Sequence, residues 1–388
     1  MTRIDSIIQQ RLEKLHRIRQ HGIDPYPHRY HRTHSTKEAI ALFEQGSNAQ
    51  LSLAGRIVAC RPMGKATFLD IRDSSGKIQV YFRRDVFDAK YDLLKELDIG
   101  DIIGVEGQLF RTHSGEITLG ATDFTLLAKS LHPLPEKWHG LVDVEKRYRQ
   151  RYLDLISNEE VRQVFLVRSR AIAAIRRFLD DRGFVEVETP VLQPTAGGAL
   201  AHPFITRHHA LAQNLYLRIA TELYLKRLII GGFDKVYEIG RIFRNEGIST
   251  KHNPEFTMLE SYEAYADYND VMRMLEEMVC YVAWEVLGTT EVVFGNVALD
   301  LSPPWRRITL RDAIKERCGI DFEEHPDEDS LRRRIEAAGL PTSEIKGRGK
   351  LIDKLISTFV EPGLIQPTIV MDYPVDLSPC LLYTSDAA

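Results

Sequence analysis

The sequence has few cysteines and no apolar run long enough to cross a membrane. Its four cysteines form no CxxC pair, so neither a zinc site nor a disulfide framework is indicated. The amphipathic N-terminal segment mixes acids with bases and has no apolar signal-peptide core, which argues against a secretory or transit peptide. We therefore expect a protein of the reducing cytoplasm with no membrane partner.

The sequence also lacks the common phosphate-binding motifs and a strong net charge. Neither GxGxxG nor GxxxxGK[ST] occurs, so no Rossmann or P-loop nucleotide site is indicated. The formal net charge of -4 gives no global basic field, so any nucleic-acid site must be a local patch. Of the 388 residues, 44% are hydrophobic and 27% are charged, which is typical of a globular chain with two or three domains.

The N-terminal part of the chain predicts a helical extension followed by a small β-barrel. Apolar residues recur at helical spacing over residues 5–20, and a loop rich in Pro and His follows. Residues 51–127 contain five short runs with partial alternation, and a helix-like segment, DAKYDLLKELD, follows the third run. This order is that of an OB-fold, with another small barrel or a sandwich as the alternative. The predicted domains are 1–50, helical; 51–130, OB-fold; and 131–160, an interdomain connection.

From about residue 161 the sequence predicts a larger α/β domain that extends to residue 379. VRQVFLVRSRAIAAIRRFLDDRG indicates a long helix closed by Gly183, and FVEVETP follows as a strand. Two further strand-like runs, VYEIGRIFRNE and EFTMLESYEAY, are joined by GISTKHNP. Pairing these two runs would direct several functional side chains into one shared space. They are Arg244, Glu246, Glu255 or Phe256, and Glu260. The pattern alone leaves an internal salt-bridge ladder and a charged site equally open.

A family resemblance decides between these readings. FRNEGISTKHNPEFTMLE resembles motif 2 of the class II aminoacyl-tRNA synthetases, and GFVEVETP resembles motif 1. The whole arrangement is similar to the lysine enzymes of the aspartate, asparagine and lysine subgroup. The resemblance implies an α+β multidomain fold, in which the OB-fold precedes an incomplete class II antiparallel-sheet catalytic domain with flanking helices. It also implies ATP-dependent activation of L-lysine, transfer to the 3′ end of tRNA(Lys), Mg²⁺, and a homodimer formed through motif 1.

The resemblance assigns five residues to ATP. Arg244 matches the motif 2 arginine that holds the α-phosphate and the substrate carboxylate, a catalytic task that suits a planar guanidinium. Glu246 matches the acceptor for the adenine amino group, and Phe256 matches the aromatic residue on which adenine stacks. His252 matches a residue near the β- and γ-phosphates, and Asn253 beside it is expected to shape the loop.

Four residues match the lysine site of the family. Glu222, Glu260 and Tyr262 match residues around the substrate side chain, and Gly198 matches the loop residue near its α-amino group. Aspartyl enzymes usually carry Gln where Glu222 stands, so an unpaired buried carboxylate would reject aspartate or asparagine about 10⁴-fold or more. A surface helix carboxylate is the alternative interpretation of Glu222.

In the predicted barrel, Arg61, Phe68 and Gln79 match positions that contact the anticodon in this subgroup. An exposed aromatic side chain on a strand can stack on unpaired bases, and the resemblance implies a U-rich lysine anticodon. The alternative is that Phe68 belongs to the core, because Leu69 and Ile71 flank it in a mixed pattern.

The sequence departs from the family at its C-terminal end. The family continues past PVDLSP with a strand, a Glu-rich metal-binding segment and motif 3, so no metal ligand is assigned in this chain. Here the pattern stops at Pro379 and a non-family tail, 380–388, follows. We therefore expect the 388-residue polypeptide to be inactive in ATP–pyrophosphate exchange and prone to aggregate.

Two further features complete the prediction. Residues 306–360 show helical patterns and resemble the insertion between motifs 2 and 3. The alternatives to a synthetase are a non-catalytic nucleic-acid-binding fragment and a paralogue that attaches lysine to a protein. Such paralogues typically lack the anticodon domain, so residues 51–127 argue against the second alternative.

Overall fold

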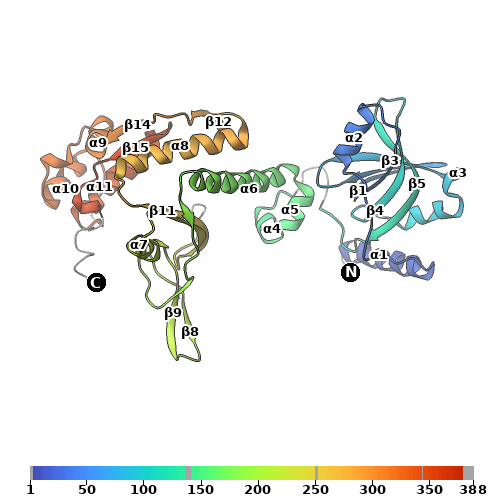
Figure 1. The fold of residues 1–388 in the computed structure, drawn as a ribbon, viewed down its shortest axis with the longest axis horizontal. Coiled ribbons are helices and arrows are strands. Elements are labelled where there is room, and N and C mark those ends of the chain that lie inside the picture. The colour runs from blue at the N-terminus through green and yellow to red at the C-terminus, as the bar shows by residue number, and fades with distance from the viewer. Residues whose placement is uncertain (1–2, 136–140, 250–251, 343, 379–388) are drawn as a thin grey trace. The chain divides into compact units, whose positions relative to one another are not determined.

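The computed structural model describes residues 3–135, 141–249, 252–342 and 344–378. The chain divides into two compact units, Met1–Arg162 and Gln163–Ala388 (Figure 1). The predicted tail at 380–388 lies outside the described residues. Within the described ranges, every helix is too short or too polar to span a lipid bilayer.

The first unit is built on a closed five-stranded barrel. Its strands are β1 (Gln50–Met63), β2 (Ala66–Arg72), β3 (Lys77–Arg83), β4 (Ile102–Arg111) and β5 (Ile117–Ala128). They close in the order β1-β2-β3-β5-β4, and helices α3 (Arg84–Phe87) and η1 (Asp88–Glu96) lie between β3 and β4. Alternate strand residues such as Leu53, Ile71 and Phe82 fill the interior completely. The predicted OB-fold is therefore confirmed.

Two helices precede the barrel. Helix α1 (Arg3–Gln20) confirms the helical N-terminal pattern, and the Pro- and His-rich stretch that follows contains no regular element until α2 (Thr36–Glu44). A capping box formed by Ser35 and Glu38 starts α2. The Arg11 guanidinium on α1 donates to the backbone oxygens of Ile99, Ser130 and His132. These bonds tie the extension to the barrel.

The segment that the sequence presents as an interdomain connection contains two short helices, α4 (Val144–Arg149) and α5 (Arg151–Ser157). Its basic residues are partly neutralised, because Arg147 and Arg151 both pair with the buried carboxylate of Asp154. Asn158 donates a further hydrogen bond of 2.6 Å to Asp154. A local charge cluster therefore orders a stretch that has little apolar periodicity.

The second unit centres on a three-stranded sheet in the order β11-β10-β6. Strands β10 (Lys235–Phe243) and β11 (Glu255–Glu263) are antiparallel, whereas β6 (Val185–Glu186) runs parallel to β10. Within the predicted FVEVETP strand, Val185 and Glu186 form the ladder with β10, and the Val187 N–H also donates to the Tyr237 oxygen over 2.9 Å. Helices α6 (Glu159–Asp180) and α8 (Tyr268–Leu287) supply Phe178, Leu179 and Met278, which pack with Tyr237 of β10 in one core.

Helix α6 ends where the sequence predicts. Gly183 adopts a left-handed conformation (φ 78°), and the Phe184 N–H donates to the Leu179 oxygen over 3.1 Å. This pattern is that of a glycine C-cap and turns the chain directly into β6.

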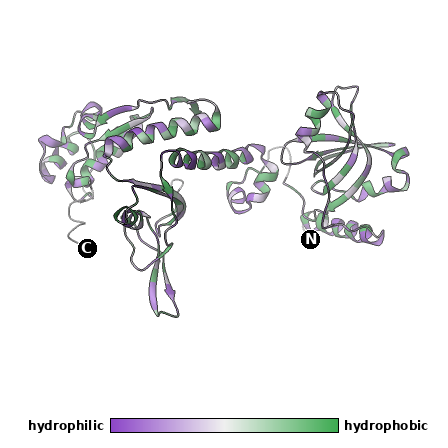
Figure 2. Cartoon of the chain, in the orientation of Figure 1, coloured by the Kyte–Doolittle hydropathy of each residue, from purple (hydrophilic) through white to green (hydrophobic). Residues whose placement is uncertain are grey.

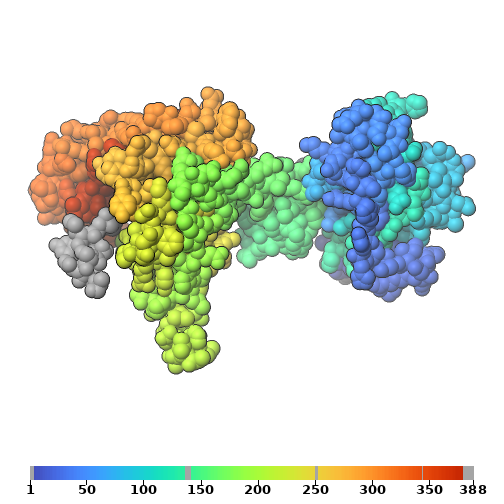
Figure 3. All heavy atoms as spheres, in the orientation of Figure 1, coloured from blue at the N-terminus to red at the C-terminus, as the bar shows by residue number. Residues whose placement is uncertain are grey.

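A second small sheet and a helix flank the central strands. Strands β7 (Leu192–Gln193), β8 (Ile205–His208) and β9 (Gln213–Leu217) pair in the order β7-β9-β8, and α7 (Glu222–Ile230) follows. The β8–β9 hairpin stands clear of the rest of its unit in the ribbon and in the space-filling view (Figures 1 and 3). The turn between β9 and α7 brings Glu222 back toward β11.

The remaining elements follow α8. They are β12 (Glu291–Phe294), β13 (Val297–Asp300), β14 (Arg306–Thr309), α9 (Leu310–Cys318), η2 (Phe322–Glu324), α10 (Glu328–Ala337), α11 (Arg348–Leu355), η3 (Ile356–Val360), η4 (Glu361–Gly363), β15 (Thr368–Met371) and η5 (Val375–Leu377). The helical prediction for 306–360 is wrong at its start, because Arg306–Thr309 pairs with β15 in a parallel ladder. Helices α9, α10 and α11 each carry a hydrophobic face (Figure 2), and these faces enclose a core that includes Ile314, Leu331 and Leu351.

Because the ammonium of Lys129 is buried, we expect its replacement to lower the stability of the first unit strongly. Its Nζ lies 2.7 Å from Asp101, and both side chains are fully buried. Replacing Lys129 with Met would leave the Asp101 charge buried without its partner, so Lys129→Met should lower the free energy of unfolding by about 3–5 kcal/mol in urea denaturation of the full chain. Lys95→Met removes an exposed pair with Asp92 and should leave stability nearly unchanged. Equal stability of the two variants would contradict this prediction.

Candidate functional site

A cavity of about 340 Å³ opens at the loop that joins β10 to β11. Its lining residues are Arg244, Glu246, Gly247, His252, Asn253, Pro254 and Phe256. The strand register explains this convergence, since Phe243 pairs with Glu255 and the Arg244 N–H donates to the Pro254 oxygen over 2.9 Å. The structure therefore brings together all five residues that the sequence assigns to ATP.

The Arg244 guanidinium lies beside the Phe256 ring. Its Cζ lies 5.4 Å from the centre of the Phe256 ring, and its Nε donates weakly, over 3.4 Å, to the Ile219 oxygen. No carboxylate of the described residues lies within ion-pair distance of it. A half-buried guanidinium beside an aromatic face can hold a phosphate while a planar base covers the ring.

The loop itself is held by a residue that sequence reasoning missed. The Ser249 hydroxyl and the His252 Nδ1 are 2.8 Å apart, and the His252 N–H also donates to the Ser249 hydroxyl. These bonds fix the His252 ring at the mouth of the cavity. A Ser three residues before a His in a loop is a common local turn motif, so the sequence held only a weak signal for it.

The four residues predicted for lysine form a second group. Glu260 accepts from the Thr221 N–H over 3.1 Å and from the Tyr262 hydroxyl over 3.4 Å. Burial, and then the charges of Glu222 and Glu260, raise the pKa of Tyr262 well above its usual range. A Cβ on Gly198 would lie 3.1 Å from the Cβ of Glu222. The group therefore brings together two carboxylates, a neutral phenol and a stretch of backbone without a side chain.

The two groups share one face of β11. Phe256, Glu260 and Tyr262 are separated by even numbers of residues, so their side chains lie on the same side of the strand. Phe256 and Glu260 are about 14 Å apart along it at 3.4 Å per residue. Of the two alternatives Glu255 or Phe256, the structure places Phe256 at the cavity, whereas Glu255 lies on the other face and pairs with Arg241 over 3.6 Å. The prediction of a single shared space is corrected in one respect, since Glu260 does not line the cavity.

Glu222 has a cationic partner that the sequence analysis did not consider. The Lys226 Nζ lies 2.6 Å from a Glu222 oxygen and 5.9 Å from the centre of the Tyr262 ring. Nearby, the Thr221 hydroxyl is buried and has no hydrogen-bond partner among the residues that the structure describes. The spacing of four residues between Glu222 and Lys226 on a helix was the available signal.

The three residues predicted to contact an anticodon lie close together on β1, β2 and β3. Arg61 is opposite Phe68, and Gln79 is opposite Asp70, to which Arg61 donates over 2.7 Å. The Phe68 ring is half-buried and stacks on Tyr81 at 4.7 Å, so it is neither core nor fully exposed. Gln79 is buried and bonds to two side chains that sequence reasoning missed, Glu116 and Thr118.

The side chains around the cavity do not fit a dedicated Mg²⁺ site. In the part of the chain that the structure describes, no three His, Cys, Asp or Glu side chains come close enough to share a metal ion. The cavity offers one carboxylate, Glu246, where Mg²⁺ prefers several oxygen ligands in octahedral geometry. No chemical step is therefore assigned through a metal held by these residues.

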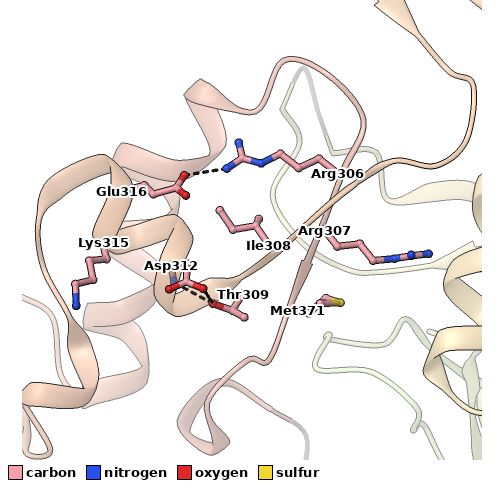
Figure 4. Close-up of a pocket in the computed structure, with 8 residues that line it drawn as sticks. All are labelled: Arg306, Arg307, Ile308, Thr309, Asp312, Lys315, Glu316 and Met371. Atoms are coloured by element: carbon pink, nitrogen blue, oxygen red, sulfur yellow. Dashed lines mark hydrogen bonds and ion pairs between the residues drawn. The ribbon is translucent and has the colours of Figure 1, made fainter.

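A separate cavity of about 440 Å³ lies among β14, α9 and β15 (Figure 4). Its basic side chains are already neutralised, since Arg306 pairs with Glu316 over 2.9 Å and Arg307 pairs with Glu276 of α8. Thr309 caps α9 by accepting from the Asp312 N–H. This cavity contains none of the residues predicted for the site. Its arginines form ion pairs that link β14 to α9 and α8.

The close approach of Gly198 to Glu222 leads to a prediction that compares two glycine substitutions. Gly198 (φ 86°) and Gly232 (φ 105°) both need the left-handed conformation, but only a Cβ on Gly198 would meet neighbours. Each Ala substitution should cost about 1–2 kcal/mol of stability from backbone strain. Calorimetry should show that Gly198→Ala alone also weakens binding of an ammonium ligand such as L-lysine, because it displaces Glu222. Equal ligand binding by the two variants would contradict this geometry.

Comparison with known proteins agrees with the two units. Residues 143–387 match the class II tRNA synthetases (D, K and N), and residues 51–127 match the OB-fold nucleic acid binding domain. The lysine–tRNA ligase of Dehalococcoides mccartyi is 58% identical over 377 residues, which are 95% of this chain and 76% of the relative. That of Moorella thermoacetica is 56% identical over 376 residues, covering 97% and 77%, and that of Bacillus cereus is 50% identical over 377 residues, covering 95% and 76%. The chain therefore belongs to the lysine–tRNA ligase family of the class II tRNA synthetases.

Proposed function

We propose that this chain activates L-lysine with ATP to form lysyl-adenylate and transfers the lysyl group to the 3′ end of tRNA(Lys). Gly198, Glu222, Glu260 and Tyr262 are called the acidic group below. One observation carries the proposal: the cavity around Arg244 and the acidic group around Glu260 lie on the same face of β11. A lysine held by its ammonium at the acidic group would direct its carboxylate along the strand toward Arg244. The relatives named as lysine–tRNA ligases support this assignment.

The cavity residues suit the nucleotide. Adenine would stack on Phe256 with its amino group donating to Glu246, and Arg244 would hold the α-phosphate. His252, fixed by Ser249, lies where the β- and γ-phosphates would extend, and Asn253 shapes the same turn. Because Arg244 has no carboxylate partner among the described residues, binding the phosphate would break no ion pair between them.

The proposed reaction has two steps, adenylate formation and transfer to tRNA. A carboxylate oxygen of lysine attacks the α-phosphorus, the bond to the bridging β-phosphate oxygen breaks, and pyrophosphate leaves. A terminal ribose hydroxyl of tRNA then attacks the acyl carbon, and AMP leaves with the former carboxylate oxygen. Arg244 acts by positioning and by stabilising the charge on the phosphate oxygens. Mg²⁺ would enter as part of the ATP substrate complex.

The selectivity of the chain for lysine over aspartate tests the proposed function. The Glu260 carboxylate accepts from Thr221 and Tyr262, and Glu260→Gln removes the charge while keeping the shape. Calorimetry on the purified chain should show L-lysine binding at least about 100-fold tighter than L-aspartate binding. Glu260→Gln should weaken lysine binding about 10- to 100-fold, the range for a hydrogen bond to a charged group.

Glu263→Gln is the matched control. Glu263 lies on the opposite face of β11 and pairs with Lys235 over 2.6 Å, so lysine affinity should not change. Equal affinity of the wild-type chain for lysine and aspartate would contradict the proposed function.

The barrel is proposed to read the anticodon of tRNA(Lys). Arg61, Phe68 and Gln79 form a compact patch in which an aromatic ring and polar groups lie side by side. Asp70 and Glu116 hold the polar groups in place, and a base could stack on the outer face of Phe68.

Phe68→Leu should separate stacking from packing. The change keeps an apolar side chain but removes the ring, so the Kd for tRNA(Lys) should rise about 5- to 100-fold. Filter binding at one fixed salt concentration measures this effect. Val86→Ala, on α3 near the barrel, should bind tRNA as the wild type does. Unchanged tRNA binding by Phe68→Leu would rule out stacking at this position.

We further propose a homodimer formed at the face beside motif 1. An apolar groove of about 480 Å³ is lined by side chains of α6, α8, β12 and β13. Val293 and Phe294 on β12 are 76% and 80% exposed, although both are strongly apolar. Contiguous apolar surface of this kind is typical of an interface between subunits.

Sedimentation velocity tests the dimer. The wild-type chain should sediment as a dimer, and the double change Val293→Asp with Phe294→Asp should convert it to a monomer because it buries charges at the contact. Tyr265→Asp, at a site that is 99% exposed, should leave the dimer intact. A wild-type monomer at micromolar concentration would contradict the proposal.

Two sequence-based alternatives and one expectation about location stay as stated. The match of residues 51–127 to an OB-fold domain disfavours a protein-lysylating paralogue. A non-catalytic fragment would bind tRNA without discriminating lysine. Location in the cytoplasm also stays a prediction.

A further inference from the structure

The acidic group already contains an ammonium ion that belongs to the chain. Lys226 extends from α7 so that its Nζ lies 2.6 Å from Glu222 and 5.9 Å from the Tyr262 ring centre. A bound lysine would offer the same functional group to the same carboxylate and ring. Lys226 is thus an internal counterpart of the proposed ligand.

The geometry leaves Glu222 only partly available. One of its oxygens holds Lys226, and the other lies 3.8 Å from the position that a Cβ on Gly198 would occupy. Glu260, in contrast, has no cationic partner among the described residues and accepts only from Thr221 and Tyr262. Substrate binding would therefore find one carboxylate free of cations and the other already neutralised.

We propose that Lys226 is a placeholder that keeps Glu222 neutralised in the empty site and competes with substrate lysine for it. This inference rests on the proposed function. If the ligand displaces Lys226, the internal ion pair is lost, and if both cations stay, they repel each other. In either case Lys226 lowers the apparent affinity for lysine, as any competing unliganded state does.

The exposure of Lys226 makes this exchange feasible. Its side chain is 44% exposed and Glu222 is 30% exposed, so the ammonium can move into water at small cost. A pair of this kind is weak enough to yield to a ligand that is also anchored at its carboxylate by Arg244. A ligand held by its ammonium alone would displace Lys226 less readily.

Lysine binding by calorimetry on the full chain tests the proposal. Lys226→Met keeps an unbranched side chain that is one atom shorter and removes the charge, and it should lower the Kd for L-lysine about two- to five-fold. Lys226→Arg keeps a cation next to Glu222 and should restore the wild-type Kd. Lys226→Gln is a second neutral variant and should also bind lysine more tightly than the wild type. It replaces the Met variant in the test if that variant folds poorly.

Two controls separate this role from a structural one. Lys235→Met removes a Lys–Glu pair of the same length, 2.6 Å, on the other face of β11, and should leave lysine affinity unchanged. The Kd for ATP should not change in any variant, whereas a disturbed fold would weaken both ligands.

The placeholder role would be overturned if Lys226→Met and Lys226→Gln bound lysine no more tightly than the wild type while ATP binding stayed intact. The proposed function would then still stand. A wild-type chain that does not bind lysine would overturn both.

Discussion

The antiparallel register of β10 and β11 is the constraint on which the site depends. Nine consecutive residue pairs, from Lys235–Glu263 to Phe243–Glu255, fix which side chains of β11 share a face and where the connecting loop begins. A slip of one residue would turn Phe256, Glu260 and Tyr262 to the opposite side together. The register therefore determines the cavity at Arg244 and the acidic group at once.

A buried ion pair on the same face of the sheet supports this register, because Glu238 lies directly opposite Glu260. Arg218 and Glu238 are both almost fully buried and bonded to each other, and Arg218 also donates to the Arg241 and Thr189 oxygens. Gly240 leaves room for this guanidinium, because a Cβ there would lie 2.1 Å from its Nη2. Since such a pair is costly to separate, it holds β10 in one position relative to the strand that precedes α7.

Much of this arrangement could be predicted from the sequence. The long helix that ends at Gly183, the five-strand barrel, and the two motif 2 strands carry strong periodicity and local stop signals, so their partners are not needed to recognise them. The resemblance to motif 2 then located Arg244, Glu246 and Phe256, and the register shows why they converge. Their roles toward ATP and lysine stay proposals.

Other features depend on partners that are distant in the sequence. Helices α4 and α5 form around the buried Asp154, a cluster that apolar periodicity does not reveal. The strand at Arg306–Thr309 exists because β15, some sixty residues later, pairs with it. The sequence places Lys226 one helical turn from Glu222, but only the fold shows that its ammonium also approaches Tyr262 of β11.

The central claim is that one molecule spans both groups along β11. A crystal structure of the chain with a non-hydrolysable lysyl-adenylate analogue tests it most directly. The account predicts adenine on Phe256, the acyl-phosphate mimic at Arg244, and the side-chain ammonium between Glu260 and Tyr262. An analogue that binds with its ammonium away from both glutamates, or its adenine away from Phe256, would contradict the account.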